Sequence, residues 1–320
     1  MDAASFVTLF RASNVVWHES DADPPRWIFR GHRNAAWRLK PRAWRTAAEG
    51  NPLHSMIKKL NSATIEDHDE IKPGTTLHQA LAWTHAERVV LNEFRRIGWY
   101  LGFDLNEPLS SYSMDVELFP PVIIDNIRDC ECFSPFISSS DIGVAQHYGV
   151  PTRFLDWTFN PIFAVFFALD DYERGLDQTD LCVWALDMRA IDLMLYTSGG
   201  ISRNLLRTTV PRRHGNDFVT AQDGLLLEIE HTWAVDYFEN NGSWPSVEEV
   251  VVTLNNEPEY NEDDSYIYHA NHPMLRRIVL AASEVPALRL ILEREGITRE
   301  KLMPTLENVA RAAIRAISKP

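Results

Sequence analysis

Residues 145–161 read AQHYGVPTRFLDWTFNP, and this stretch fixes the local structure at the middle of the chain. Ser and Asp residues just before it offer N-caps for a short helix that we expect to end near His147, at the stop formed by Gly149. A turn follows. Pro161 suits the first turn of a second helix, which runs through Ala168. That helix has apolar residues on every side, so we expect it to be buried.

Strand-like segments lie on both sides of this stretch. Residues 27–31 form a short aromatic and β-branched run that ends at Gly, and 180–186 and 224–229 are apolar runs rich in β-formers. Between the first two, apolar residues recur at spacings of three and four over 76–102, which predicts a long amphipathic helix. Strands with segregated helices predict an α+β fold with a central mixed or antiparallel sheet and flanking helices.

The last third of the chain changes in character. Gly, Pro, Asn and acidic residues surround Val250–Leu254, which looks like a strand in a peripheral insertion. Met274–Leu280 is amphipathic with two exposed arginines, and helices are expected to start at Pro286 and Pro304 as a C-terminal helical cap. We therefore predict a core over 1–238, an acidic insertion packed on it over 239–270, and closing helices over 271–320.

Composition excludes several classes of protein. The chain has 320 residues, 45% of them hydrophobic and 24% charged, which excludes a disordered chain, a collagen and a coiled coil. The net charge of -14 disfavours non-specific binding to DNA or to anionic lipid. Because arginines are bunched between Arg26 and Arg45, a local basic cleft is still allowed.

Cysteine usage and the chain start bear on localisation. Three cysteines are poor material for a disulfide framework, which favours a reducing cytoplasm. The first residues lack the pattern of a secretory signal. The longest apolar run, Pro161–Leu169, is far shorter than the roughly 20 residues of a membrane span. We therefore expect a cytoplasmic protein that does not enter a membrane.

Motifs of common chemistries are missing from the sequence, including the phosphate loop, the dinucleotide-binding glycine turn and the hydrolase nucleophile elbow. His85 and Glu87 have the spacing of a zinc deaminase, but Cys130 and Cys132 have the wrong spacing to complete its metal site. We therefore expect no metal cofactor, with His85 as a polar position on the long helix.

Two motifs carry a resemblance to a known family. Phe29, Arg30 and Gly31 give the F/Y-R-G motif, and 146–161 follows the pattern Q-H-Y/H-G-x-P-T-R-L-L-D-W-T-x-N-P with Phe154 in place of the first leucine. The chain thus resembles the FRG domain family. Weaker agreement extends to 222–224 and to the C-terminal helices, so the resemblance spans roughly 27–316. The acidic insertion and the leucines at 225–227 depart from the pattern.

The resemblance implies little function by itself, but a strand with Arg and Gly followed by a late strand with Glu is similar to ADP-ribosyltransferases. This likeness is at the level of the fold. It implies NAD as substrate, a possible role as a toxin or phage-defence effector, and a site that joins a cation for the pyrophosphate to a carboxylate near the ribose.

Arg30 is the candidate cation, because guanidinium pairs two oxygens of a phosphate or ribose, and Gly31 lets a ligand approach the backbone. The alternative for Arg30 is a structural ion pair, for instance with Asp156. Arg153 and Asp156 lie three residues apart and can pair, with a structural clamp as likely as a catalytic pair. His147 is a candidate acid, base or helix cap.

The remaining candidates are hydroxyl, amide and carboxylate groups. Thr152 is a candidate ligand for ribose or phosphate, although threonine beside a turn often bonds its own backbone. Glu228 and Glu230 are expected on one face of a strand, in the E-x-E arrangement of some transferases, and Gln222 rivals Glu230 for the place at the reacting ribose. Either glutamate can instead belong to a solvated strand face.

The tryptophans leave a second function open. A nicotinamide or adenine ring could stack on one of them, although core positions are the commoner use: Trp27, Trp37, Trp44 and Trp157. Three of the four lie in or beside the arginine-rich stretch, which suits a non-catalytic module that binds a nucleotide, RNA or a protein. The net charge of -14 weighs against RNA.

Overall fold

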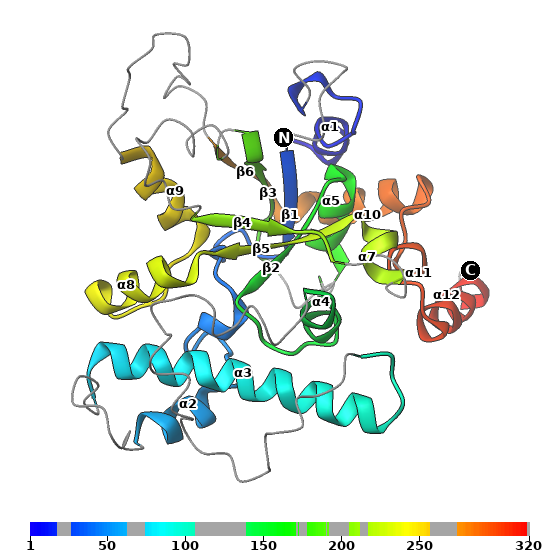
Figure 1. Cartoon of the computed structure of the whole chain (residues 1–320). Coiled ribbons are helices and arrows are strands. Elements are labelled where there is room, and N and C mark those ends of the chain that lie inside the picture. Colours follow the sequence, from blue (N-terminus) through cyan, green and yellow to red (C-terminus); the bar gives the residue numbers. More distant parts are fainter. Residues whose placement is uncertain are drawn as a thin grey trace.

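The computed structural model describes residues 1–17, 27–62, 74–105, 139–170, 172, 178–189, 191, 205–211, 217–256 and 274–318. Over these residues, helices cover both faces of one antiparallel sheet (Figure 1). The predicted α+β class with a central sheet and flanking helices is therefore confirmed. The division of the chain at 238 and 270 stays a prediction.

The sheet of the described residues has six strands in the order β4-β5-β2-β1-β3-β6, and each neighbouring pair is antiparallel. Their bounds are β1 Trp27–His32, β2 Phe154–Thr158, β3 Leu181–Asp187, β4 Leu206–Thr209, β5 Gly224–Ile229 and β6 Leu275–Leu280. The order places the two sequence motifs, on β1 and β2, side by side at the centre. The strands predicted at 27–31, 180–186 and 224–229 are thus confirmed.

Alternation along the strands divides the core in two. Ile28 of β1 packs with Leu155 on one face of the sheet, whereas its neighbour Phe29 packs with Val183 on the other. All four side chains are almost fully buried. A strand sends successive side chains to opposite faces, so a sheet covered on both faces needs apolar residues at every position.

One face is covered by α1 (Ala3–Leu9), α5 (Pro161–Asp170) and α10 (Val285–Arg294). The apolar residues on every side of α5 are explained by its place between the sheet and α10. Both α5 and α10 begin where their prolines predicted. This part of the fold was therefore readable from local signals.

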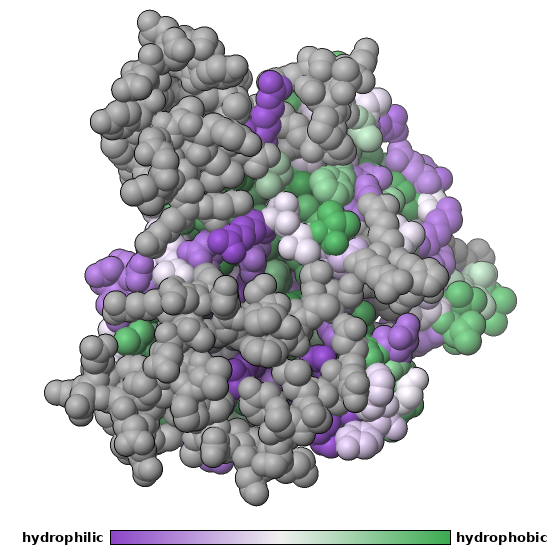
Figure 2. All heavy atoms as spheres, viewed as in Figure 1, coloured by the Kyte–Doolittle hydropathy of each residue, from purple (hydrophilic) through white to green (hydrophobic). Residues whose placement is uncertain are grey.

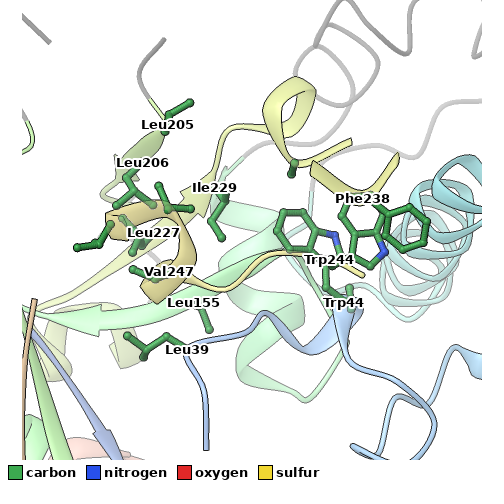
Figure 3. Packing of buried hydrophobic residues seen from close by; sticks show 14 of the residues in the cluster. Leu39, Trp44, Leu155, Leu205, Leu206, Leu227, Ile229, Phe238, Trp244 and Val247 are labelled. Carbon is green, nitrogen blue, oxygen red and sulfur yellow. The ribbon is translucent and has the colours of Figure 1, made fainter. Parts of the chain in front are cut away.

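The other face is covered by α2 (His54–Asn61), α3 (Thr76–Tyr100), α8 (His231–Asn241) and α9 (Val247–Asn256). The rings of Trp44 and Trp244 stack there, with centroids 4.8 Å apart and planes 12° from parallel. Figure 3 shows these rings beside Phe238, with Leu155 and Leu227 of the sheet nearby. The predicted long helix is confirmed as α3.

Shorter elements complete the described fold: α4 (Ser139–His147), α7 (Asp217–Gln222), α11 (Arg299–Leu302), α12 (Leu306–Ser318), and the 3-10 helices η1 (Val15–Trp17), η2 (Arg42–Trp44) and η6 (Ala282–Glu284). The helical C-terminal cap is confirmed by α10, α11 and α12. Apolar side chains of α12, among them Leu306 and Ile317, are exposed, and apolar spheres gather at this edge of the molecule in Figure 2.

The prediction of a strand at Val250–Leu254 was wrong, because these residues belong to helix α9. Glu249 accepts hydrogen bonds from the backbone N and the hydroxyl of Ser246, at 2.7 and 3.1 Å, which is the glutamate's half of a capping box. Buried residues then recur at 247, 250, 251 and 254 with the period of a helix. The serine and glutamate three residues apart were the missed signal.

Met274–Leu280 also differs from the expected amphipathic segment among helices, because 275–280 form strand β6 along β3. Arg276 lies over the ring of Trp27, with its Cζ 4.5 Å from the ring centroid, and Arg277 lies 5.6 Å from that of Trp184. Two adjacent arginines therefore cover tryptophans from opposite faces of a strand at the end of the sheet, where charged side chains discourage further pairing.

Candidate functional site

The two central strands diverge next to their shared pair. β1 pairs with β3 from Trp27 to His32, and β2 pairs with β5 from Phe154 to Thr158, but the register of β1 with β2 is given by Phe29 and Thr158 alone. The residues of β1 after Phe29 and those of β2 before Thr158 are therefore separated from one another by a gap in the sheet.

A cavity of about 660 Å³ lies at this gap, which is within the usual size of small-molecule sites. Arg30, Gly31 and His32 line it from β1, and Phe154 and Asp156 line it from β2. Further lining residues come from the segment after β1, from the end of α4 and from α5. Side chains from the two motifs, far apart in sequence, thus meet around one cavity.

Two hydrogen bonds hold the segment after β1 against the turn that precedes β2. The backbone N of Ala43, in η2, donates to the carbonyl of Thr152 at 3.2 Å. Arg42 donates from Nη1 to the carbonyl of Gly149 at 2.9 Å. Gly149 has a φ of +89°, which favours glycine at the end of α4. The arginine-rich segment is therefore fastened to the turn between α4 and β2.

The lining is strongly basic in a chain whose net charge is -14. Four arginines and two carboxylates line the cavity: Arg30, Arg33, Arg42, Arg45, Glu49 and Asp156. Burial and the charge of Arg42 lower the pKa of Arg45. The four arginines outnumber the two carboxylates, so the lining keeps an excess of positive charge that favours an anion.

The guanidinium of Arg30 is held on two sides. Its Nε donates to Nε2 of His32 at 3.1 Å, and its Nη1 donates to the backbone carbonyl of Asp156 at 2.5 Å. Nη1 also lies 4.0 Å from Oδ2 of Asp156. Burial and the charge of Arg30 lower the pKa of His32 to about 3, so the imidazole is neutral and Nε2 can accept.

The part of the chain that supplies α4, β2 and α5 is also the part recognised by comparison. The FRG domain family matches residues 135–176. This match covers 42 of the 320 residues and identifies an FRG domain in this part of the chain. No curated protein and no solved structure matches it. In the residues that the structure describes, no helix is both long and apolar enough to span a membrane.

Four of the predicted site residues line the cavity: Arg30, Gly31, Thr152 and Asp156. Thr152 donates from Oγ1 to Oε1 of Gln146, another lining residue. The carboxylate of Asp156 is exposed, whereas the side chain of Arg30 is mostly covered. The cation and the carboxylate expected at a glycosyl-transfer site are therefore adjacent. The alternative prediction, a structural Arg30–Asp156 ion pair, requires the same geometry.

Gly31 has a packing constraint in addition to its place in the lining. A Cβ at this position would lie 2.0 Å from the carbonyl oxygen of Ala164 and 2.4 Å from the backbone N of Ala168. The space beside its Cα is thus filled by α5. Gly31 brings the helix and the strand together, and this contact explains the glycine without a ligand.

Arg153 lies behind the wall, buried against α3. Its Nε lies 3.1 Å from Oε2 of Glu87, and its backbone N donates to Oε1 of Glu87 at 2.6 Å. Both side chains are at most 3% exposed. Arg153 is not among the lining residues of the cavity. Arg153 is therefore held in a structural position by Glu87 of α3, and not by Asp156 as the spacing along the chain suggested.

Glu230 and Gln222 also lie away from the cavity lining. Strand β5 ends at Ile229, and Glu230 is the N-cap of α8, accepting from the backbone N of Thr232 and Trp233 at 3.1 and 2.7 Å. Gln222 donates from Nε2 to the carbonyl of Leu302 at 3.1 Å. The expected E-x-E pair on one strand face is therefore absent, because Glu230 has left the strand.

His147 lies at the end of α4, beside the lining residue Gln146. Burial lowers the pKa of His147, and the negative charge of Asp156 partly offsets this shift. The imidazole is therefore neutral at pH 7 and within electrostatic range of the Asp156 carboxylate. The ring of Tyr148 lies edge-on to it at 5.3 Å.

Two lining residues, His32 and Glu49, were not singled out from the sequence, whereas Arg42 and Arg45 belong to the arginine-rich stretch for which a basic cleft was allowed. Glu49 accepts from the backbone N and hydroxyl of Thr46, at 2.7 and 2.9 Å, which fixes its loop. The bunched arginines were the available signal. In the described ranges no group of three His, Cys, Asp or Glu is placed to hold a metal, and Cys130 and Cys132 lie outside those ranges.

Proposed function

We propose that the cavity binds NAD and that the protein cleaves the bond between nicotinamide and ribose. The observation that carries the proposal is the meeting of four arginines and the exposed Asp156 carboxylate around one cavity, in an otherwise acidic chain. The proposal assigns the cation and the carboxylate of the resemblance to ADP-ribosyltransferases to particular residues of this cavity.

The arginines supply the binding part of the proposal. The pyrophosphate of NAD carries two negative charges, and guanidinium groups present paired N–H donors that match phosphate oxygens. Arg30 is held by His32 and the Asp156 carbonyl in one orientation. A fixed donor loses little conformational freedom when it binds an oxyanion, which favours affinity and orientation.

Asp156 supplies the catalytic part. When nicotinamide leaves with the electron pair of the glycosidic bond, C1′ of the ribose becomes an oxocarbenium-like cation, which a neighbouring carboxylate stabilises. The oxygen of water, or a nucleophilic group of an acceptor, then forms the new bond to C1′. The proton that this group loses passes to a base, for which neutral His147 or Asp156 is the candidate.

The test is nicotinamide release from NAD by the purified protein, followed by chromatography, with NAD consumed in equal amount. We expect turnover by wild type, a loss of at least about 100-fold in Asp156→Asn, and a similar loss in Arg30→Met. Arg311→Gln changes an exposed arginine of α12 and is the matched control. Melting curves exclude unfolding as the cause.

The alternative is a nucleotide-binding module without chemistry. It predicts that ADP-ribose binds in calorimetry and that Arg30→Met abolishes this binding, while wild type releases no nicotinamide and modifies no protein. That combination of results would refute the proposed cleavage.

A role as an NAD-depleting effector, of the toxin or phage-defence type, follows if cleavage is fast in cells. Induced expression of wild type in a bacterial host should lower cellular NAD and stop growth, and Asp156→Asn at equal abundance should do neither. Growth arrest that is equal in both strains would contradict this role.

A further inference from the structure

Among the residues that the structure describes, Trp37 is the one tryptophan in the lining of the cavity. It differs from the other three tryptophans that the sequence offered for stacking. Trp27, Trp44 and Trp157 are at most 5% exposed, so they belong to the core. Trp37 is 43% exposed. An indole that is both exposed and at a cavity is available to stack on a flat ligand.

The Trp37 ring is held in place by its neighbours. Its backbone N donates to the carbonyl of Asn34 at 3.1 Å, which closes a turn after β1. His32 lies edge-on to the indole, with ring centroids 6.2 Å apart. The Cζ of Arg33 lies 5.1 Å from the ring centroid. Indole and guanidinium thus form a cation–π pair in the wall of the cavity.

The charges around the cavity distinguish the two ends of NAD. The nicotinamide ring of NAD carries a positive charge, whereas adenine is neutral. Near Trp37 a cationic ring would meet the positive charge of Arg33, but an adenine can stack on the indole and on the guanidinium without that repulsion. The exposed Asp156 carboxylate, on the opposite strand, attracts the cationic ring, and this attraction opposes the repulsion from Arg30, whose Nη1 lies 4.0 Å from Oδ2 of Asp156.

We propose that Trp37 and Arg33 form the adenine-binding platform of the cavity, which places the nicotinamide end of NAD at Asp156. This assignment deepens the proposed function and rests on it for the identity of the ligand. It makes Trp37 the residue that sets specificity for an adenine-containing nucleotide, with the pyrophosphate bound by other arginines of the lining.

The test compares two fragments of NAD by calorimetry: ADP-ribose, which contains adenine, and nicotinamide mononucleotide, which does not. We expect Trp37→Leu to raise the Kd of ADP-ribose about tenfold or more, the usual effect of losing one base–aromatic stack. The Kd of nicotinamide mononucleotide should change less than twofold. Trp37→Phe should recover most of the affinity for ADP-ribose.

Trp99→Leu is the matched control, because Trp99 on α3 is 44% exposed and does not line the cavity. It should change neither affinity. Equal weakening of both fragments by Trp37→Leu, an unchanged Kd of ADP-ribose, or no binding of ADP-ribose to wild type would each overturn the platform. ADP-ribose lacks the bond to nicotinamide and is not turned over, so a protein that binds it as expected but releases no nicotinamide from NAD fails only the proposed cleavage.

Discussion

Glu87 of α3 and Arg153, which precedes β2, form a buried ion pair 66 residues apart in sequence, with Oε2 and Nε separated by 3.1 Å. The second carboxylate oxygen of Glu87, Oε1, accepts a hydrogen bond from the backbone N of Arg153. Burial raises the pKa of Glu87, and Arg153 opposes the shift. The pair fixes the backbone between Thr152 and β2, so α3 positions one wall of the cavity.

Removing one member of this pair should destabilise the protein strongly. Glu87→Gln leaves the Arg153 charge buried without its counter-ion, and we expect the free energy of unfolding to fall by about 3–5 kcal/mol. Denaturant titration measures this loss. Glu307→Gln, in an exposed pair with Arg311, should change it by less than about 1 kcal/mol.

The double variant Glu87→Gln with Arg153→Met removes the buried charge altogether. It should recover at least half of the lost stability, since an uncharged pair carries no desolvation penalty. A single variant Glu87→Gln within about 1 kcal/mol of wild type would contradict the clamp.

Local signals predicted much of the fold. The caps and prolines around α4, β2 and α5 act within a few residues, and the apolar period of α3 was long enough to read. The sequence reading failed for α9, where valines suggested a strand but the capping box and tertiary packing decide the helix. β6 was missed because its pairing with β3 is a long-range property.

The site was predictable in part from the two motifs. Arg30 was found on a predicted strand, whereas Asp156 was found in the motif at 146–161 without strand β2 being predicted there. Glu230 was placed on a strand face, yet the strand ends one residue earlier and the carboxylate caps a helix. The partner of Arg153 is Glu87 of helix α3, and no spacing along the chain indicates this pairing.

Gly31→Ala should show the tight contact of β1 with α5. The added methyl would lie 2.0 Å from the Ala164 oxygen, so strand and helix must separate. We expect a loss of at least about 3 kcal/mol, or failure to fold. Gly50→Ala, with a φ of +81° and no atom within 4 Å of the new Cβ, should cost about 1 kcal/mol.

Denaturant titration of the two glycine variants in parallel decides between a contact effect and a general effect of losing glycine. Equal losses of stability in Gly31→Ala and Gly50→Ala would refute the contact with α5 as the cause.

Arg45→Gln should separate binding from stability. The charge of Arg45 lowers the pKa of Arg30 and of His32, so it contributes to the positive potential of the cavity. Its structural contact is a hydrogen bond from Nε to the carbonyl of Lys40 at 3.2 Å. We expect the Kd of ADP-ribose to rise about 5- to 20-fold, since a charge-assisted bond to phosphate is lost.

The melting temperature of Arg45→Gln should fall by no more than about 4 °C, because a single part-buried hydrogen bond contributes little net stability. Calorimetry at two salt concentrations checks the origin of the affinity: the difference between wild type and variant should shrink as salt rises. A difference that is independent of salt would argue against a phosphate contact.

His32 should make stability depend on pH. Its pKa is about 3 in the folded state, against an ordinary value of 6.5, because the imidazole is buried beside Arg30. Between these values the unfolded chain binds a proton that the folded chain does not. The contribution of His32 is therefore complete above pH 6.5 and is lost as the pH falls, at about 1 kcal/mol per pH unit near pH 5.5.

His32→Gln keeps a side-chain acceptor for Arg30 but cannot titrate. We expect the free energy of unfolding between pH 6 and pH 5 to fall less steeply in this variant than in wild type, by about 1 kcal/mol per pH unit. His54→Gln changes an exposed histidine of α2 and should leave the slope of wild type unaltered. Parallel slopes for wild type and His32→Gln would mean that His32 is protonated in the folded protein, and Nε2 could then not accept the bond from Arg30.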